Sequence, residues 1–338
     1  MILLTGGAGY IGSHTAVVLL RAGYEVLVVD NFCNSSPESL KRIEKITGKK
    51  CPYIRGDIRD RALLDNVFQQ HTIEAVIHFA GLKAVGESYA KPLDYYHCNV
   101  FGTITLLQAM QAFGVKTFVF SSSATVYGNA PIPYTEQTPT GVPSNPYGRT
   151  KLHIEQILQD LSNSDDEWKI ALLRYFNPVA AIETGEIGED PLGIPNNLMP
   201  FISQVAVGKL PELAVFGNDY PTRDGSCVRD FIHIMDLAEG HCAALDFLQN
   251  PAHPNGVHIW NLGTGKGISV LEMIAAFEKV NQVKIPYRIA PKRDGDLAEF
   301  YANPNKAKME LNWQAKRSLE DMMRDLWNWQ KNNPNGYR

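Results

Sequence analysis

The sequence predicts an α/β fold in which a doubly wound parallel sheet is followed by a smaller α/β region. Two observations predict it. Short apolar runs alternate with amphipathic stretches of helical period through the first half of the 338 residues, and each run ends in small or polar residues. Near residue 180 the composition changes: residues 185–200 are rich in glycine, proline and asparagine, and the predicted elements that follow are shorter.

The composition of the whole chain argues against several classes of protein. A formal net charge of -4 argues against nucleic acid or a membrane surface as the main partner. No apolar run approaches the roughly 18 residues that span a membrane, and the N-terminus resembles no leader peptide, so we expect a cytoplasmic protein. The 5 cysteines and 9 histidines lack disulfide-framework or metal-ligand spacing, so we expect reduced thiols and no metal.

The first apolar run, residues 2–4, leads into Gly6, Gly9 and Gly12 and then into the amphipathic stretch 13–20. A strand, a glycine turn and a helix in this order are typical of a dinucleotide site. Glycine permits the tight turn and the close approach of a diphosphate, and the helix N-terminus attracts the anion.

The second predicted strand, residues 25–30, ends in Asp30. A carboxylate at this distance from the glycine turn suits the two ribose hydroxyls of an adenosine, and it would repel a 2′-phosphate. The position therefore favours NAD over NADP. The alternative is that Asp30 is an ordinary cap at a strand end.

Further apolar runs at residues 51–55, 75–79, 117–120 and 170–174 are the next predicted strands. In a parallel doubly wound sheet, the carboxyl ends of the strands line the ligand crevice. The residues that follow these ends are therefore candidates to contact a dinucleotide: Asp57, Phe79, Lys83 and Ser123. Each of them singly could equally be an ordinary loop residue.

Tyr147 and Lys151 stand four residues apart at the predicted start of a helix, so their side chains share one helical face. Ile154 and Leu158 continue that face, which indicates that it is buried. A cation beside a partly buried phenol lowers its pKa, so we expect Tyr147 to titrate close to neutral pH and to exchange a proton with a substrate. Alone, this spacing is more typical of a surface tyrosine and a solvated lysine.

We place a domain boundary at residue 180. Residues 1–180 form the predicted NAD-binding Rossmann-type domain, to which the apolar run 257–262 is a candidate to return. Residues 181–338 form the predicted substrate domain, and we expect its end, residues 332–338, to be a loose tail.

Two arginines of the second half, Arg229 and Arg293, lie in otherwise neutral loops. A planar guanidinium binds a phosphate through two parallel hydrogen bonds, which lysine cannot do. These arginines are therefore candidates for a phosphate clamp. The alternative is that each is solvated or paired with a neighbouring acid.

The glycine turn together with Tyr147 and Lys151 resembles the extended short-chain dehydrogenase/reductase family. Within that family, the similarity to enzymes that epimerise UDP-hexoses runs nearly from end to end. The segments that carry it are residues 78–88, 121–128, 173–178, 193–200 and 228–233. The last four are far more specific than either short motif.

The resemblance implies an isomerase that keeps NAD bound and interconverts UDP-galactose and UDP-glucose, an activity of galactose metabolism. It implies three catalytic residues, Ser123, Tyr147 and Lys151. The implied cofactor contacts are Gly6, Gly9, Tyr10, Ile11, Gly12, Asp30, Asn31, Asp57, Ile58, Phe79, Ala80, Gly81, Lys83, Asn99, Ser123, Tyr147, Lys151 and Phe176. The implied UDP-sugar contacts are Lys83, Ser123, Tyr147, Asn177, Asn197, Leu198, Phe216, Arg229, Arg293, Asp296 and Phe300.

The resemblance also implies a homodimer, because members of the family commonly pair two helices from each subunit. In this chain those helices would be residues 93–113 and 147–161. Residues 181–338 would bind the UDP-sugar.

Two rival functions use the same scaffold. A 4,6-dehydratase also begins by oxidising C4, but it needs an Asp-Glu pair directly after the serine of this strand end, where the chain has Ala124 and Thr125. A non-catalytic dinucleotide sensor would keep the glycines and lose the tyrosine and lysine. Intact Ser123, Tyr147 and Lys151 therefore favour the epimerase.

Phe300 follows Asp296 by four residues, at a position where the resembled family lines the hexose pocket. In that family a bulky aromatic residue is associated with exclusion of N-acetylated sugars. We therefore expect UDP-glucose and UDP-galactose to be substrates and UDP-N-acetylglucosamine to be a poor one. The alternative is that Phe300 is a core aromatic on a strand.

Overall fold

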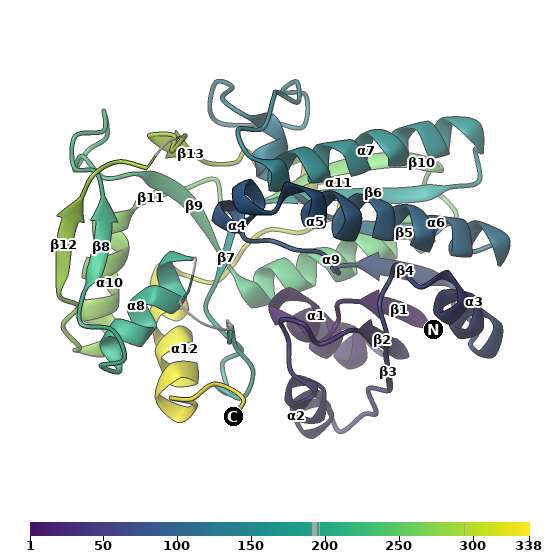
Figure 1. Ribbon diagram of the computed structural model, residues 1–338, viewed down its shortest axis with the longest axis horizontal. Coiled ribbons are helices and arrows are strands. Elements are labelled where there is room, and N and C mark those ends of the chain that lie inside the picture. Colours follow the sequence, from purple (N-terminus) through teal and green to yellow (C-terminus); the bar gives the residue numbers. More distant parts are fainter. Residues whose placement is uncertain (191–194, 196, 294) are drawn as a thin grey trace.

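A computed structural model describes residues 1–190, 195, 197–293 and 295–338 of the protein. Among these residues, seven parallel strands form a central sheet in the order β10-β6-β5-β4-β1-β2-β3 (Figure 1). The strands are β1 (Ile2–Thr5), β2 (Val26–Asp30), β3 (Tyr53–Arg55), β4 (Ala75–His78), β5 (Thr117–Ser123), β6 (Lys169–Tyr175) and β10 (Gly256–Leu262). The strand order reverses between β1 and β4, and such a reversal is where doubly wound sheets bind ligands. The predicted fold class is confirmed.

The strands of the central sheet are apolar throughout because both faces of the sheet are covered. In β1, Ile2 and Leu4 belong to the core on one face and Leu3 to the core on the other, and all three are fully buried. The helices α1 (Tyr10–Ala22), α2 (Pro37–Thr47) and α9 (Ile234–Gln249) cover the first face. The helices α3 (Arg61–Gln70), α6 (Gly102–Ala112) and α7 (Pro146–Ser164) cover the second.

A second lobe, on the left in Figure 1, is built from residues of the second half of the chain. Its strands are β7 (Asn177–Val179), β8 (Leu213–Phe216), β9 (Val228–His233), β11 (Gly267–Ser269), β12 (Tyr287–Ala290) and β13 (Glu299–Phe300). Its helices are α8 (Leu198–Ala206), α10 (Val270–Asn281) and α12 (Leu319–Asn332). They enclose a separate core that includes Ile202, Phe277 and Met323.

The two lobes exchange segments of the chain. β9 belongs to the second lobe and runs directly into α9, which packs on the central sheet. β10 returns from the second half of the chain to pair with β6 at the edge of the central sheet. The division into two functional domains at residue 180 stays a prediction.

The remaining helical segments are short: α4 (Val85–Ala90), α5 (Pro92–Tyr95), the π-helical η1 (Tyr96–Phe101), the 3₁₀-helical η2 (Ala124–Tyr127) and α11 (Asn305–Glu310). The expected loose tail at residues 332–338 is wrong. The Tyr337 ring packs 5.0 Å from the Trp329 ring, and the Tyr337 amide donates to Asp190. Burial of an aromatic ring there outweighs the entropy of a free chain end.

Within the described residues, no helix combines the length and the apolar character needed to cross a bilayer.

Candidate active site

The turn after β1 requires glycine at two positions. Gly6 has a φ of 70°, and a Cβ there would lie 2.6 Å from the backbone nitrogen of Ala80. A Cβ on Gly12 would lie 2.5 Å from the carbonyl oxygen of Gly6. Gly9 precedes α1 and makes no side-chain cap, so the first amides of this helix are left for an anion. The turn therefore fits the diphosphate of a dinucleotide.

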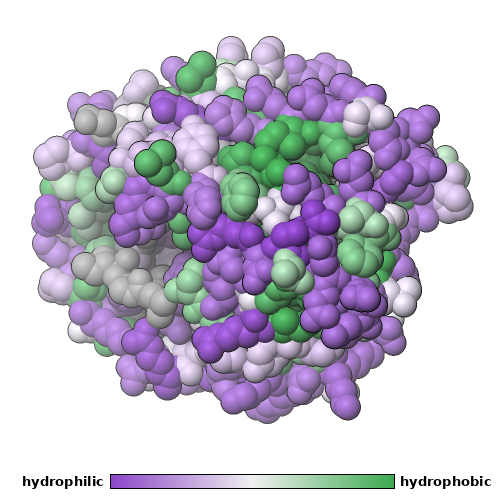
Figure 2. Space-filling view, turned by 45° about the vertical axis from the view of Figure 1, so that its right-hand side comes forward, coloured by the Kyte–Doolittle hydropathy of each residue, from purple (hydrophilic) through white to green (hydrophobic). Residues whose placement is uncertain are grey.

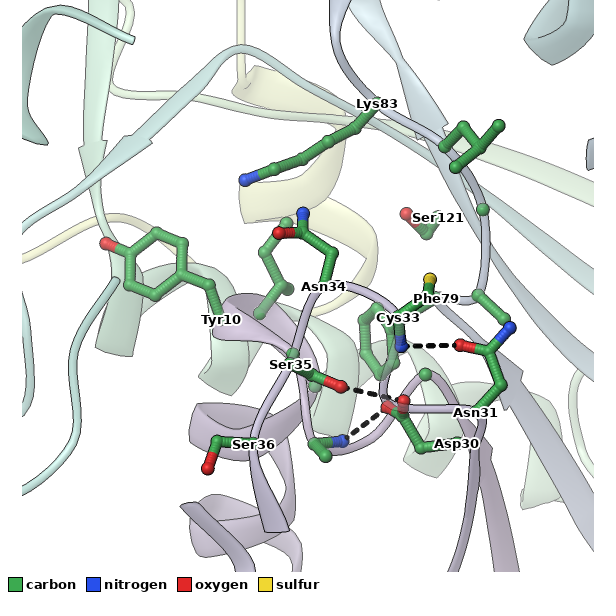
Figure 3. Close-up of a pocket in the computed structure, with 18 of the residues that line it drawn as sticks. Tyr10, Asp30, Asn31, Cys33, Asn34, Ser35, Ser36, Phe79, Lys83 and Ser121 are labelled. Atoms are coloured by element: carbon green, nitrogen blue, oxygen red, sulfur yellow. Dashed lines mark hydrogen bonds between the residues drawn. The ribbon is translucent and has the colours of Figure 1, made fainter. Parts of the chain in front are cut away.

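Asp30, at the end of β2, is held at both carboxylate oxygens. Oδ2 accepts a hydrogen bond from the Ala8 amide at 3.0 Å, and Oδ1 accepts one from the Ser35 hydroxyl at 2.8 Å (Figure 3). The Phe32 amide donates to Oδ1 at 2.8 Å. These bonds fix the carboxylate beside the glycine turn, which suits ribose hydroxyls and disfavours a 2′-phosphate.

A cavity of about 380 Å³ follows the carboxyl ends of β1, β2 and β4. The predicted cofactor residues that line it are Gly6, Gly9, Tyr10, Ile11, Gly12, Asp30, Asn31, Asp57, Ile58, Phe79, Ala80, Gly81, Lys83, Tyr147 and Lys151. Asn99, Ser123 and Phe176 were also predicted and do not line it.

Sequence reasoning missed two parts of this cavity: the loop between β2 and α2, and residues of the second half of the chain that include Glu189, Asp190 and Tyr337. Cys33, Asn34, Ser35 and Ser36, in the loop between β2 and α2, all line it (Figure 3). The signal was available, because the loop follows the carboxyl end of β2 as directly as Asp57 follows that of β3. No sequence motif marks the loop.

Asp57 is bound by two neighbours. The Arg59 guanidinium donates to both of its oxygens, at 2.8 and 2.7 Å, and the Asn31 amide donates to Oδ2 at 3.0 Å. The hydrogen bonds from Arg59 hold the pKa of the Asp57 carboxyl well below its usual range. The carboxylate is thus a fixed acceptor in the cavity wall and can accept a hydrogen bond from an adenine or a ribose.

The Asn99 side chain holds the loop that carries Lys83. Its Oδ1 accepts from the Leu82 amide at 2.7 Å, and its Nδ2 donates to the Leu82 carbonyl at 3.0 Å. Nδ2 also donates to Thr150 of α7 at 3.1 Å. The amide is buried and fully engaged, so Asn99 positions this wall of the cavity from behind.

The start of α7 places Tyr147 and Lys151. Asn145 caps the helix, with Oδ1 accepting from the Gly148 amide at 2.8 Å, and Pro146 occupies the first turn, where proline is favoured. Both Tyr147 and Lys151 then point toward the carboxyl end of β5 and line the cavity.

Lys151 is buried and anchored to β5. Its Nζ donates to the Ser121 carbonyl at 2.6 Å and lies 4.8 Å from the Phe120 ring centroid. Burial lowers the pKa of the Lys151 ammonium to about 8. At neutral pH the group is therefore mainly charged, and donors that Ser121 does not use face the cavity.

The predicted near-neutral pKa of Tyr147 is wrong for the protein without ligand. Burial raises the pKa of the phenol, and its hydrogen bond with Ser123 acts in the opposite direction but is weaker. The Lys151 Nζ lies 5.9 Å from the centre of the Tyr147 ring and is bound to a carbonyl oxygen. Desolvation of the phenolate therefore dominates in the empty site. An oxidised nicotinamide would bring a positive charge that opposes this effect.

Thr125 orients the Ser123 hydroxyl. Ser123 Oγ accepts hydrogen bonds from the Thr125 amide at 3.2 Å and from the Thr125 hydroxyl at 2.9 Å. With both lone pairs used in this way, Ser123 acts only as a donor, and in the empty site its hydrogen bond with Tyr147 uses that proton. Thr125 thus supports a hydrogen-bonding serine at a position where a dehydratase would need a carboxyl group.

A buried ion pair behind the site fixes α7 on the sheet. Glu155, one helical turn after Lys151, pairs with Arg174 of β6 at 2.5 and 2.9 Å and accepts from the Ser122 hydroxyl at 2.5 Å. Both charged side chains are about 95% buried. Buried polar groups satisfied in this way define one relative position of α7 and β5, and so of Tyr147 and Ser123.

The predicted UDP-sugar residues of the second lobe do not line the cofactor cavity. Four of them lie together. Arg293 donates to Asp296 at 2.8 and 3.2 Å, and its guanidinium lies 4.8 Å from the Phe216 ring. Arg229 lies 3.6 Å from Asp296 and donates to the Leu297 carbonyl at 2.8 Å. The cluster thus offers cations beside an exposed aromatic face.

The other predicted substrate residues of the second lobe lie in β7 and at the start of α8. Asn177, in β7, donates to the Asp230 carbonyl of β9 at 3.0 Å. Asn197 and Leu198 stand at the start of α8. In the related segment 193–200, Gly193, Ile194 and Asn196 lie outside the described residues, as does Asp294 beside Arg293.

Over the described part of the chain, no group of three or more His, Cys, Asp and Glu side chains could hold a metal ion. The absence of a metal from the function stays a prediction.

Comparison with known proteins places the chain among nucleotide-sugar enzymes. A family model described as GDP-mannose 4,6 dehydratase matches residues 3–326. A UDP-glucose 4-epimerase of Bacillus subtilis is 60% identical over 100% of this chain and 98% of its own length. A UDP-glucose 4-epimerase of Pasteurella multocida is 59% identical over 100% of this chain and 99% of its own length. The crystal structure of UDP-glucose 4-epimerase from Bifidobacterium longum, in complex with NAD+ and UDP, is 54% identical, has a TM-score of 0.95 and covers 99% of each chain.

The fold, the glycine turn and the tyrosine-lysine pair on α7 define an extended short-chain dehydrogenase/reductase. Two kinds of nucleotide-sugar enzyme, dehydratase and epimerase, appear among the matches. Identity over the full length decides between them, and the chain belongs to the UDP-glucose 4-epimerase family. Ala124 and Thr125, which carry no carboxyl group, agree with this assignment.

Proposed function

We propose that this protein interconverts UDP-galactose and UDP-glucose in galactose metabolism. It oxidises C4 of the hexose to a ketone and reduces the ketone from the opposite face, with NAD as its cofactor. One observation carries the proposal: Tyr147 and Lys151 line the same cavity as the glycine turn and Asp30. The site therefore joins a proton-transfer pair to a dinucleotide pocket.

The chemistry requires a cofactor because the C4–H of a hexose is not acidic enough to be removed as a proton. NAD, when bound, supplies the electron sink that no side chain can provide. The groups that would hold it are the amides of the glycine turn, Asp30 at the adenosine ribose, Asp57 and Ile58 at the adenine, Phe79 and Lys83 at the middle, and Lys151 at the nicotinamide ribose.

Tyr147 takes the proton of the C4 hydroxyl as the carbon is oxidised and returns it when the ketone is reduced. Ser123 donates a hydrogen bond to the same oxygen, since Thr125 occupies its acceptor positions. Proton transfer by a positioned group of this kind contributes about 10²- to 10⁴-fold in rate.

The keto sugar must turn over between the two half-reactions. This requires a loose grip on the hexose and a firm grip on UDP. The arginine cluster around Asp296 supplies charged donors at the nucleotide end, whereas Phe300 supplies an aromatic surface without donors at the sugar end.

Arg229→Ala and Arg293→Ala are expected to raise KM for UDP-galactose. Hydrogen bonds from arginine to a diphosphate are worth about 1.5 to 3 kcal/mol, so KM rises roughly tenfold to a hundredfold while kcat changes little. Steady-state kinetics measure both constants. Arg288→Ala is the control, because Arg288 pairs with Glu212 on the exposed surface of the same lobe. A large fall in kcat at unchanged KM would instead place the two arginines at the reacting carbon.

Phe300 lies in an aromatic cluster next to Arg229. Its ring lies 5.0 Å from that of Tyr134 and 5.2 Å from that of Phe176, and β13 pairs Phe300 with Arg229 of β9. The ring is half-buried. An N-acetyl group that overlapped this ring would overpack the site at a cost of roughly 1 to 3 kcal/mol.

Phe300→Cys is therefore expected to raise kcat/KM for UDP-N-acetylgalactosamine relative to UDP-galactose by about 5- to 150-fold. The measurement is kcat/KM for both sugars in both proteins. Phe300→Tyr keeps the bulk of the ring and serves as the control, with an unchanged ratio. Comparable wild-type values for the two sugars, or no gain in the Cys variant, would refute the proposed exclusion.

The proposed function is tested by denaturing the purified protein and identifying the released nucleotide, then supplying UDP-galactose to the native protein. We expect NAD in the first experiment and UDP-glucose in the second. NADP in place of NAD would refute the role of Asp30. A dehydrated keto sugar as product would favour the dehydratase.

We further infer a homodimer formed through residues 93–113, which span parts of α5, η1 and α6, and through residues 147–161 of α7. The support is an apolar surface on this side of the molecule, which Figure 2 shows as a group of hydrophobic residues near the top of the face. Leu93 is 80% exposed and Phe101 is 46% exposed, and both precede α6. Exposed apolar groups of this size favour burial against a second copy. Sedimentation analysis decides the oligomeric state.

We also infer a cytoplasmic location. The five cysteines all lie in the described part of the chain and all are free thiols there. Unpaired thiols suit a reducing compartment.

A further inference from the structure

Glu189 is an acidic residue in the cavity that the mechanism above does not use. It lies between β7 and α8, lines the cavity together with Tyr10 and Lys83, and its side chain is only 7% exposed. Its backbone carbonyl accepts a hydrogen bond from Trp329 Nε1 of α12 at 3.2 Å. The second lobe therefore holds this residue in place.

One oxygen of Glu189 binds two groups from opposite sides of the cleft. Oε1 accepts from Lys83 Nζ at 2.8 Å and from Asn197 Nδ2 at 3.2 Å. Lys83 follows β4 of the central sheet, and its extended side chain carries the ammonium to the side of the pocket where Tyr10 lies (Figure 3). Asn197 stands at the N-terminal end of α8 in the second lobe, and its side chain makes no capping hydrogen bond to that helix.

The carboxylate is the fixed member of this group. The Lys83 side chain is 48% exposed and ends a flexible stem, whereas Glu189 is nearly buried. A lysine loses up to about 2 kcal/mol of rotamer entropy when it is ordered. If the Lys83 side chain is already ordered in the empty site, less of this entropy is lost when the ligand binds.

We propose that Glu189 is a positioning residue, which orients Lys83 and Asn197 for the UDP-sugar and the cofactor before they bind. The inference rests on the proposed function, in which Lys83 contacts the cofactor, and on the predicted contact of Asn197 with the UDP-sugar. An ion pair with a half-exposed lysine is weak, so Lys83 can share its three donors between Glu189 and a phosphate. Asn197 likewise keeps a second amide proton and its oxygen for the ligand.

The opposite role is physically possible and predicts the opposite sign. A carboxylate in a site for diphosphates can act as a competing anion that repels the ligand. Removal of Glu189 would then tighten binding. Removal of a positioning residue loosens it. The direction of the change in affinity therefore separates the two roles.

Glu189→Ala is expected to raise the Kd of UDP and the KM of UDP-galactose by about five- to tenfold, with kcat within about twofold of wild type. Glu189→Gln retains an acceptor oxygen and should restore most of the affinity. Glu183→Ala is the matched control, because Glu183 lies in the same segment, is 53% exposed and is 3.7 Å from Arg21. Calorimetry with UDP measures Kd, and NAD released on denaturation measures cofactor content.

Unchanged or tighter UDP binding in Glu189→Ala would overturn the proposal. A second comparison tests whether Glu189 acts through Lys83. In a Lys83→Met background, Glu189→Ala should raise the Kd of UDP by a smaller factor than in the wild type. Equal changes in Kd in the two backgrounds would refute the proposal that Glu189 acts through Lys83. Failure of the proposed function would look different, because wild-type protein would then bind no UDP or would not convert UDP-galactose.

Discussion

Tyr147→Phe is expected to reduce kcat for epimerisation of UDP-galactose by at least about 10²-fold. The substitution removes one hydroxyl and leaves the half-buried ring, the cap by Asn145 and the Lys151 anchor in place. The fold and the NAD content should therefore stay close to wild type. The loss is expected in the chemical step, because Tyr147 is the proposed acceptor of the C4 hydroxyl proton.

The measurement is kcat and KM for UDP-galactose, together with NAD content. Tyr24→Phe is the control, because the Tyr24 hydroxyl binds Asp246 and Gln249 at the surface of α9, away from the cavity. Turnover of Tyr147→Phe within a few-fold of wild type would exclude Tyr147 as the proton carrier.

The central sheet could be predicted because its signals are local. Each strand is a short apolar run, and burial on both faces makes such a run continuous rather than alternating. Gly6 and Gly12 were identified for the same reason, since the close backbone contacts at both positions arise within one strand-turn-helix unit and the strand beside it.

The parts that could not be predicted depend on contacts between distant segments. Glu189 meets Lys83 across 106 positions of the chain, and nothing in the sequence near either residue marks the other. The pKa of Tyr147 was wrong for a related reason. Helical spacing places Lys151 on the same face, but it cannot show that the ammonium turns to the Ser121 carbonyl or that desolvation raises the pKa of the phenol.

The hydrogen-bond partners of Asn99 and Ser123 could not be predicted from their positions in the sequence. The resemblance assigns both residues to the cofactor, yet neither lines the cavity, and the Asn99 amide is engaged by Leu82 and Thr150 behind the cavity wall. Ser123 lies at the end of β5, and its orientation by Thr125 depends on the 3₁₀ turn η2 that follows. Side-chain partners of this kind require the folded backbone.

Lys151→Ala is expected to reduce kcat by about 10²-fold and also to weaken retention of NAD, which Tyr147→Phe should leave intact. Two interactions are lost together: the charge near the phenol and the donors proposed to hold the nicotinamide ribose. Lys151→Met is the matched variant, because it keeps apolar packing against Phe120 without the charge. Gel filtration followed by assay of bound NAD measures retention.

The pH dependence separates these two losses. Turnover should rise with pH as the phenol loses its proton, and an ammonium nearby favours the phenolate. Loss of the ammonium raises the pKa of Tyr147 further, so the acidic limb of the kcat profile should move to higher pH in Lys151→Ala and in Lys151→Met. Burial places the pKa of Lys151 at about 8 and raises that of Tyr147 in the empty site, so the effect is expected in the NAD-bound protein, at pH values below about 8 where the Lys151 ammonium is charged. If the acidic limb did not move at saturating NAD, the proposed effect of Lys151 on the pKa of Tyr147 would be refuted. The contact with the nicotinamide ribose would then be the only role proposed for Lys151.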